Sequence, residues 1–225
     1  MNYKSLLLKF SRNSKVSFSQ EGEDLIVLEF LKRIKSHNGF YVDVGAHHPF
    51  RFSNTALLYQ KGWRGINIEA DPDLLRAFKR YRPDDKNINV GISSHENTFK
   101  FFRFRDKAWN TFSEERALFV EDKLDEKSEV LYLKTTSLNG ILSNNLNIFK
   151  GISILNIDIE GLDEIVLTSL DLEKYKFSII LIEDHKRRWP DNSVISNLLY
   201  HHNYVELAKT NKTYIFVEDK LIRSE

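Results

Sequence analysis

Residues that can take part in chemistry stand at the ends of five apolar segments of this sequence, each with the pattern of a short buried strand. In an open sheet of parallel strands, ligands bind beyond the carboxyl ends of the strands. A charge close to a core is costly unless it is paired or hydrated, so these groups predict a ligand site at one edge of a sheet. They are Asp43, Gly45 and Ala46; Glu69 and Ala70; Gly91, Ile92 and Ser93; Asp158 and Glu160; and Glu183, Asp184 and His185.

Two of these carboxylates indicate what kind of ligand the site takes. Asp43 precedes Gly45, which lets the backbone approach a ligand closely, and its charge suits a cation or an ammonium group. Glu69 ends the next strand, where an acid accepts hydrogen bonds from ribose hydroxyls. The phosphate-binding patterns G-x-G-x-x-G and G-x-x-x-x-G-K-[ST] do not occur in the sequence. A nucleoside without a phosphate therefore fits better than a dinucleotide, and S-adenosylmethionine is such a ligand.

The elements that position these residues alternate between strand and helix. Strands are predicted at 40–44, 65–69, 88–92, 152–159, 177–182, 204–209 and 213–218, and helices at 21–35, 53–61, 72–83, 137–146, 162–170 and 192–201. This alternation is typical of a mostly parallel sheet with helices on both faces. Only three residues join the last two strands, so they must form an antiparallel hairpin. We expect a Rossmann-like α/β fold with the hairpin ending of class I methyltransferases, which dehydrogenase domains normally lack.

Length and composition limit the class of protein. The chain has 225 residues, a usual size for one α/β domain. It contains 33 Lys and Arg against 32 Asp and Glu, which argues against a nucleic-acid partner. The absence of cysteine excludes disulfides and thiolate metal sites, and a reducing cytoplasm fits this composition. The apolar run near the start is too short for a membrane span or a signal peptide, so we expect a cytoplasmic location.

Several blocks of the sequence resemble the FkbM family of methyltransferases, and together they extend from about residue 17 to about residue 185. They are SQEGED at 19–24, GFYVDVGAHHP at 39–49, SNT at 53–55, GWRGINIEADP at 62–72 and LNIDIEG at 155–161. The sequence departs from the family pattern in two places. Asp163 stands where the family usually has Glu, and the region 95–129 is only loosely similar.

The resemblance implies one S-adenosylmethionine-dependent methyltransferase domain over residues 1–225. Residues 1–38 would form a helical extension, and residues 95–135 a variable insert near the acceptor pocket. The methionine part of the cofactor would lie against the first strand end, its ribose at the second, and its adenine beside the turn 91–93. The implied cofactor contacts are Gln20, Asp43, Gly45, Ala46, Asn54, Glu69, Ala70, Gly91, Ile92, Ser93 and Asp158.

Methyl transfer to an alcohol requires a group that takes the hydroxyl proton. Our hypothesis places Asp158 beside the reacting carbon and assigns Glu160 or His185 as the proton acceptor. It uses no metal. The alternative is Mg²⁺ bound by Asp158, Glu183 and Asp184, because Mg²⁺ prefers oxygen ligands and lowers the pKa of a bound hydroxyl.

The expected acceptor is a hydroxyl of a small polar molecule, most simply a sugar of a glycan or a secondary metabolite. Trp109 and Phe112 could stack on such a sugar or belong to the core of the insert. His47 and His48 are adjacent, and no third ligand follows at a metal-site spacing, so we expect them in a loop near the cofactor.

Two rival functions remain at this stage. An NAD-dependent Rossmann oxidoreductase could use Glu69 equally well, but the missing glycines and the terminal hairpin count against it. A catalytically inactive module that binds a nucleoside or a glycan would not need the carboxylates Asp43, Glu69, Asp158 and Glu160, which argues for an enzyme.

Overall fold

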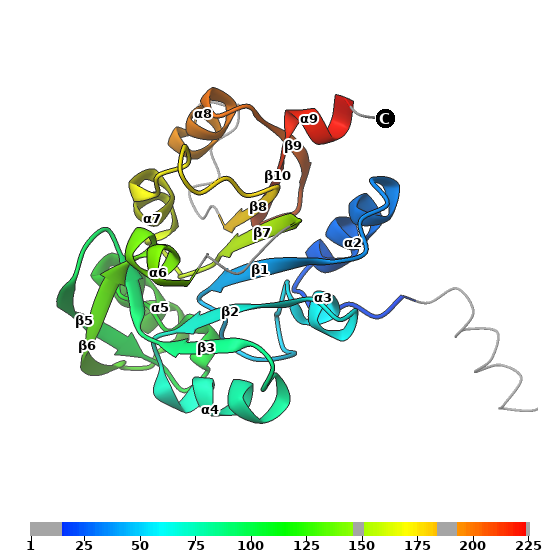
Figure 1. Cartoon of the computed structure of the whole chain (residues 1–225). Coiled ribbons are helices and arrows are strands. Elements are labelled where there is room, and N and C mark those ends of the chain that lie inside the picture. Colours follow the sequence, from blue (N-terminus) through cyan, green and yellow to red (C-terminus); the bar gives the residue numbers. More distant parts are fainter. Residues whose placement is uncertain (1–14, 146–150, 184–192, 224–225) are drawn as a thin grey trace, which may run out of the picture.

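The computed structural model describes residues 15–145, 151–183 and 193–223, and is built on a seven-stranded sheet (Figure 1). The strand order is β3-β2-β1-β7-β8-β10-β9. From β3 to β8 all neighbours are parallel, whereas β10 runs antiparallel to both β8 and β9. The strands are β1 (Gly39–Val44), β2 (Arg64–Glu69), β3 (Lys86–Asn89), β7 (Ile152–Ile157), β8 (Ile179–Glu183), β9 (Tyr204–Lys209) and β10 (Thr213–Glu218). The predicted α/β fold with a terminal antiparallel hairpin is confirmed.

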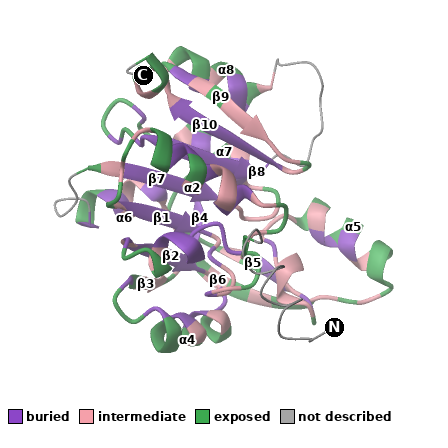
Figure 2. Cartoon of the chain, turned by 90° about the vertical axis from the view of Figure 1, so that its right-hand side faces the viewer, coloured by how far each residue is buried: buried purple, intermediate pink, exposed green. Residues whose placement is uncertain are grey.

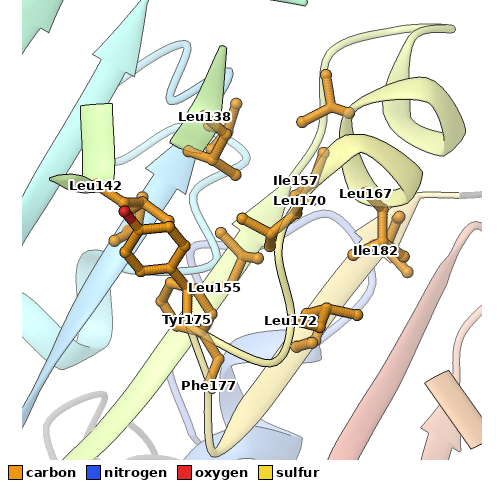
Figure 3. Close-up of a cluster of buried hydrophobic side chains, with 14 of the residues drawn as sticks. Leu138, Leu142, Leu155, Ile157, Leu167, Leu170, Leu172, Tyr175, Phe177 and Ile182 are labelled. Carbon is orange, nitrogen blue, oxygen red and sulfur yellow. The ribbon is translucent and has the colours of Figure 1, made fainter. Parts of the chain in front are cut away.

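Helices cover both faces of this sheet because side chains alternate along each strand. Val42 and Val44 of β1 pack with helices α6 (Leu138–Asn145), α7 (Asp163–Ser169) and α8 (Val194–His201) in the larger core cluster. Figure 3 shows part of this cluster, in which leucines from α6 and α7 meet β7 and β8. Tyr41 faces the opposite side, toward α2 (Glu23–Arg33), α3 (Ala56–Gln60) and α9 (Asp219–Arg223). Helix α4 (Pro72–Tyr81) packs beside β2 and β3.

Two segments of the predicted insert at 95–135 join residues 91–93 in a second, smaller sheet of order β4-β6-β5. Its strands are β4 (Gly91–Ser93), β5 (Asn97–Arg103) and β6 (Glu129–Ser137), and between β5 and β6 lie the 3₁₀ turn η1 (Lys107–Trp109) and helix α5 (Glu114–Leu124). The prediction of one strand over 88–92 is wrong. The chain leaves the main sheet after Asn89 and joins the small sheet at Gly91, where β4 pairs with β6. Figure 2 shows α5 on the outside of the molecule, with much of its surface exposed.

The predicted start of the first helix differs from the structure. The spacing of Ser17 and Gln20 is that of a capping box, but no side chain caps α2, which begins after Gly22 with its left-handed φ of 91°. The Ser17 hydroxyl instead donates to Asp24 at 2.7 Å, so the side chain of Asp24, inside the helix, organises the preceding turn. No helix in the described parts of the chain is long and apolar enough to cross a membrane.

Candidate active site

A pocket of about 860 Å³, counting space open to solvent, lies beyond the carboxyl ends of β1, β2 and β7. The predicted edge of the sheet is therefore the edge that carries the pocket. Predicted site residues that line it are Gln20, Asp43, Gly45, Ala46, Glu69, Ala70, Gly91, Ile92, Asp158 and Glu160. The lining also contains Asn156, which was not predicted, and several residues of the insert, among them Lys107, Asn110 and Phe112.

Among the described residues, Asn54, Ser93 and Glu183 of the predicted site do not line this pocket. Asn54 is buried beneath it, where its amide donates to Asn156 Oδ1 at 2.9 Å. The Ser93 hydroxyl donates to the carbonyl of His95 at 2.7 Å, because β4 belongs to the small sheet. Asp184 and His185 lie outside the described residues.

The two aromatic residues considered for sugar stacking have different surroundings. Phe112 lines the pocket and packs on Phe101, with ring centroids 4.8 Å apart. Trp109 packs against the cationic groups of Arg116 and Lys123 in the insert, at 5.4 and 4.7 Å. Of the two, only Phe112 is placed to touch a ligand in the pocket.

Gly45 brings the loops after β1 and β7 into direct contact. Its φ is 78°, and a Cβ atom built on it would lie 1.8 Å from the carbonyl oxygen of Asp158. Backbone hydrogen bonds fix the same contact, since Asp158 N donates to Val44 O at 3.0 Å and Gly45 N donates to Ile68 O at 3.0 Å. The close approach predicted for this glycine is thus to another strand end of the chain.

Glu69 connects the loops that follow β1 and β2. One carboxylate oxygen accepts from His47 N at 2.9 Å and the other accepts from Asp71 N at 2.7 Å. Burial raises the pKa of Glu69 to about 7, against the opposing effect of these two backbone hydrogen bonds. The carboxyl group is fixed in orientation, and each oxygen keeps a further lone pair for a ligand hydroxyl.

Asp71 extends this arrangement to the insert. It caps α4 by accepting from Asp73 N at 2.9 Å, as the Asp-Pro start of the helix predicts. Its other oxygen accepts from the Asn110 amide at 3.2 Å. The insert is therefore held directly against the second strand end.

Three carboxylates meet at the ends of β7 and β8. Each of Asp158, Glu160 and Glu183 places an oxygen within 4.8 Å of the others. Burial raises the pKa of Asp158 well above its usual value, and the negative charges of Glu183 and Glu160 add to this effect. The protonated form of Asp158 is thereby favoured, and in that form it can donate a hydrogen bond.

Glu160 forms an ion pair that the sequence did not predict. Nε and Nη2 of Arg116 donate to the same Glu160 oxygen, at 3.1 and 2.8 Å. The Thr111 hydroxyl also donates to the backbone carbonyl of Glu160 at 2.6 Å. A guanidinium beside a carboxylate stabilises its charged form and weakens it as a base. This pairing suits a role in fixing the insert better than a role as proton acceptor.

Asp163 explains how the turn that presents Glu160 is formed. Its two carboxylate oxygens accept from Ile159 N at 2.9 Å and from Gly161 N at 3.0 Å. Burial and the charge of Glu183 raise the pKa of Asp163 to about 7. The acid that replaces the usual Glu of the resembled family therefore binds the backbone of the β7 loop.

Comparison with known protein families gives a match for this chain. The sequence profile described as the methyltransferase FkbM domain matches residues 43–206, which is more than half of the chain. The chain belongs to the FkbM methyltransferase family. This membership supports S-adenosylmethionine-dependent methyl transfer as the general activity. No curated protein sequence matches the chain significantly.

Solved structures of methyltransferases resemble this FkbM domain only at low similarity. One is a TehB-like SAM-dependent methyltransferase from Corynebacterium glutamicum, with 10% identity, a TM-score of 0.41 and coverage of 96% of each chain. Another is a putative RNA methyltransferase from Pyrococcus horikoshii, with 14% identity, a TM-score of 0.40 and coverage of 96% of this chain and 99% of that one. Similarity at this level adds nothing to the assignment of substrate or mechanism.

His47 of the FkbM domain lines the pocket, in the loop where the sequence placed it. Both ring nitrogens are buried and have no hydrogen-bond partner among the described residues. The ring stacks on Phe52, and both residues have left-handed backbone φ values of 52° and 57°. Burial lowers the pKa of His47 to about 4, with a smaller contribution from Arg51. The imidazole is therefore neutral at physiological pH and keeps a nitrogen lone pair for a ligand.

The low pKa of His47 predicts a specific acid sensitivity of folding. Between pH 7 and pH 5 the unfolded chain protonates this residue, whereas the folded chain does not until about pH 4. The free energy of unfolding thus loses about 2 kcal/mol over this range through His47 alone. Asparagine tolerates the left-handed backbone at this position. In urea unfolding measured at pH 7 and pH 5, His47→Asn should therefore lose about 2 kcal/mol less unfolding free energy than the wild type does. Equal losses in the two proteins would contradict the buried, neutral imidazole.

Proposed function

We propose that this chain is an O-methyltransferase that transfers a methyl group from S-adenosylmethionine to a hydroxyl of a small polar acceptor, most simply a sugar of a glycan or a secondary metabolite. The observation that carries the proposal is the fixed carboxyl group of Glu69 at the end of β2, in a pocket that also contains Asp43 and Asp158. Family membership supports the reaction type. A cytoplasmic location remains part of this proposal.

The pocket lining fits the parts of this cofactor. Glu69 offers oriented lone pairs to the ribose hydroxyls, and Ile68, Leu74, Val90 and Ile92 supply an apolar surface for a purine. Asp43 offers a negative charge to an ammonium group. When bound, the cofactor supplies a methyl group that its positively charged sulfur activates.

The acceptor hydroxyl must lose its proton as the new bond forms, and three residues are candidates for taking it. Glu160 and His185 are the predicted ones, and the ion pair with Arg116 makes Glu160 the weaker of them as a base. The imidazole nitrogens of His47 have no partner among the described residues and provide a further candidate, but a pKa lowered to about 4 makes this imidazole a weak base as well. Protonated Asp158 would orient the acceptor by donating a hydrogen bond to its oxygen.

The insert supplies the remaining pocket wall. Its residues Lys107, Asn110 and Phe112 line the pocket opposite the strand ends. A wall of aromatic and polar groups suits a sugar, whose ring has apolar faces and hydroxyl edges. A ligand that displaces water from this pocket would favour a reaction in which the opposite charges of sulfonium and developing alkoxide cancel.

Ligand binding and methyl incorporation test this function in two steps. S-adenosylhomocysteine should raise the melting temperature of the chain, because it binds the folded state, and NAD should not. The chain incubated with methyl-labelled S-adenosylmethionine and a panel of glycans should then label a sugar hydroxyl. Stabilisation by NAD alone would support an oxidoreductase. Binding of S-adenosylhomocysteine without any labelled product across glycan, lipid and peptide panels would support a module that does not catalyse transfer.

The reaction should not depend on Mg²⁺. Asp158 and Glu183 are two members of the alternative metal site, and Asp184 lies outside the described residues. Glu160 of this cluster is paired with Arg116 at 2.8 Å, and burial with the charges of Glu183 and Glu160 raises the pKa of Asp158, and both effects oppose binding of a cation. We expect EDTA to leave the transfer rate unchanged. A loss of activity that added Mg²⁺ restores would establish the metal-assisted alternative.

A further inference from the structure

A buried polar layer lies beside the pocket, on the face of the sheet that α2 and α3 cover. Asp43 of β1 pairs in register with Asn67 of β2 and with Asn156 of β7, so three polar side chains form a row across neighbouring strands. Their exposed fractions are 2%, 0% and 4%. Burying such groups is costly unless they are hydrogen-bonded, and a row of them in an otherwise apolar sheet indicates a function beyond packing.

The layer is completed by an ion pair with no solvent exposure. Arg82 follows α4, and its Nε donates to Asp85 Oδ2 at 2.9 Å, with both side chains 0% exposed. Nη2 of Arg82 also donates to the hydroxyls of Tyr41 at 2.7 Å and Thr55 at 3.0 Å. The Thr55 hydroxyl in turn donates to Asp43 Oδ2 at 2.5 Å. The guanidinium is thus paired directly with Asp85 and separated from Asp43 by one hydroxyl group.

The charges of this cluster do not balance. One guanidinium, that of Arg82, faces two carboxylates, those of Asp85 and Asp43. Asp85 is saturated, since it also accepts from Gly65 N at 2.8 Å, from the Asn67 amide at 2.9 Å and from the Tyr41 hydroxyl at 2.6 Å. Asp43 accepts only from the neutral groups of Thr55 and Asn156 among the described residues. Of the two carboxylates, Asp43 lines the pocket, so the unbalanced negative charge faces the ligand.

The ionisable groups around Asp43 act in opposite directions. Burial raises the pKa of Asp43, Asp85 adds to the rise, and the charge of Arg82 is the largest effect that lowers it. Tyr41 stays neutral, because burial raises its pKa as well. Arg82 is therefore the only cation of the described structure that opposes protonation of Asp43 at close range.

From this geometry we infer that Arg82 is a positioning residue for ligand binding: it keeps Asp43 fixed and negatively charged, and the cluster is completed by a cationic group of the bound ligand. The inference rests on the proposed function, in which that group is the ammonium of the amino-acid part of the cofactor. The inference adds that the ligand must carry a positive charge. It assigns this requirement to Arg82, which does not touch the ligand.

The test measures binding of S-adenosylhomocysteine by calorimetry at pH 6, 7 and 8. The double variant R82M/D85N removes the ion pair as a unit, so that no buried charge of the pair is left alone. Glu69, with its pKa of about 7, titrates in this pH range in every variant, so the readout is the loss of affinity relative to the wild type. Between pH 8 and pH 6 the double variant should lose at least about tenfold more affinity than the wild type, as Asp43 takes up a proton. Adding D43N should give weak binding with the pH dependence of the wild type.

A second variant serves where the double variant does not fold. Thr55→Val removes the hydroxyl between Arg82 and Asp43 and retains the volume of the side chain, and Thr55 forms no side-chain cap of α3. It should produce the same pH dependence at smaller amplitude. The matched control, Thr168→Val, changes an exposed threonine of α7 and should bind as the wild type does.

Three results would overturn the inference, and each differs from failure of the proposed function. Binding by R82M/D85N or Thr55→Val that equals wild type at every pH would remove the role of Arg82, and an equal loss at every pH would show a purely structural role. Equal affinity of the wild type for S-adenosylhomocysteine and for an analogue without its amino group would remove the requirement for a cation. Wild-type protein that binds no S-adenosylhomocysteine at any pH would instead refute the proposed cofactor.

Discussion

Gly45→Ala should abolish binding of S-adenosylhomocysteine, with a loss of affinity of at least about 100-fold. An added methyl group would lie 1.8 Å from the carbonyl oxygen of Asp158 and 2.8 Å from its carbonyl carbon. Both are backbone atoms, which cannot rotate away as a side chain can. The backbone φ of 78° is also strained for alanine. The loops after β1 and β7 must therefore separate, and both carry residues that line the pocket.

Gly62→Ala is the matched control for this prediction. Gly62 has a similar φ of 92°, but nothing lies within 4 Å of the Cβ position. This variant should lose about 1–2 kcal/mol of unfolding free energy from backbone strain alone and bind S-adenosylhomocysteine normally. Calorimetric titration of both variants, with unfolding measured in parallel, separates the close contact from the strain. Normal binding by Gly45→Ala would show that the contact between the two loops does not shape the pocket.

Gly45 also illustrates how far the sequence can predict this site. The strand followed by glycine predicted a close approach of the backbone to a ligand, and the structure instead shows a close approach to the Asp158 carbonyl, which a glycine at a left-handed φ permits. The partner of that approach could not be predicted, since the Asp158 carbonyl is 113 positions further along the chain. The positions of the strands and the pocket edge follow from the apolar pattern and from the rule for parallel sheets, whereas contacts between loops follow from register.

Asn54 was assigned to the pocket by the resemblance to the family, and Ser93 because it stands at the end of a predicted strand. Ser93 lies in a strand that has changed sheets, and Asn54 lies beneath the pocket against Asn156. Proximity along the chain does not determine to which side of a strand end a side chain points. A signal for Asn156 was present: it is a polar residue inside an apolar strand, as Asp43 is in the first one.

Arg82 and Arg116 could not be found from the sequence at all. Arg82 stands in a charged segment after α4, which is typical of a solvated surface, yet its side chain is completely buried. Arg116 lies in the charged run 114–129, and its partner Glu160 is 44 positions away. The burial of Arg82 and the pairing of Arg116 with Glu160 depend on how α4 and the insert pack against the sheet. Local patterns in the sequence carry no information about that packing.

Glu69→Gln should weaken binding of S-adenosylhomocysteine about 100-fold, a loss of the same order as that expected for Gly45→Ala. The two carboxylate oxygens of Glu69 accept from the backbone N–H groups of His47 and Asp71. The glutamine amide presents its NH₂ group to one of these donors, which leaves a buried N–H without an acceptor at a cost of about 1–3 kcal/mol. The variant also loses charge-assisted hydrogen bonds to the ribose. Glu206→Gln, at an exposed position of β9, is the matched control and should bind normally.

Nucleoside fragments can distinguish the ribose contact at Glu69 from a general disturbance of the loops. If Glu69 binds the ribose diol, Glu69→Gln should weaken adenosine binding by nearly the same factor as S-adenosylhomocysteine. It should have much less effect on 2′,3′-dideoxyadenosine, which lacks both hydroxyls and gains nothing from the carboxylate in the wild type. Competition titrations against S-adenosylhomocysteine give the three affinities for each protein. An equal loss for adenosine and for the dideoxy nucleoside would mean that Glu69 acts only by holding the loops of His47 and Asp71, and the ribose site would then have to be sought elsewhere in the pocket.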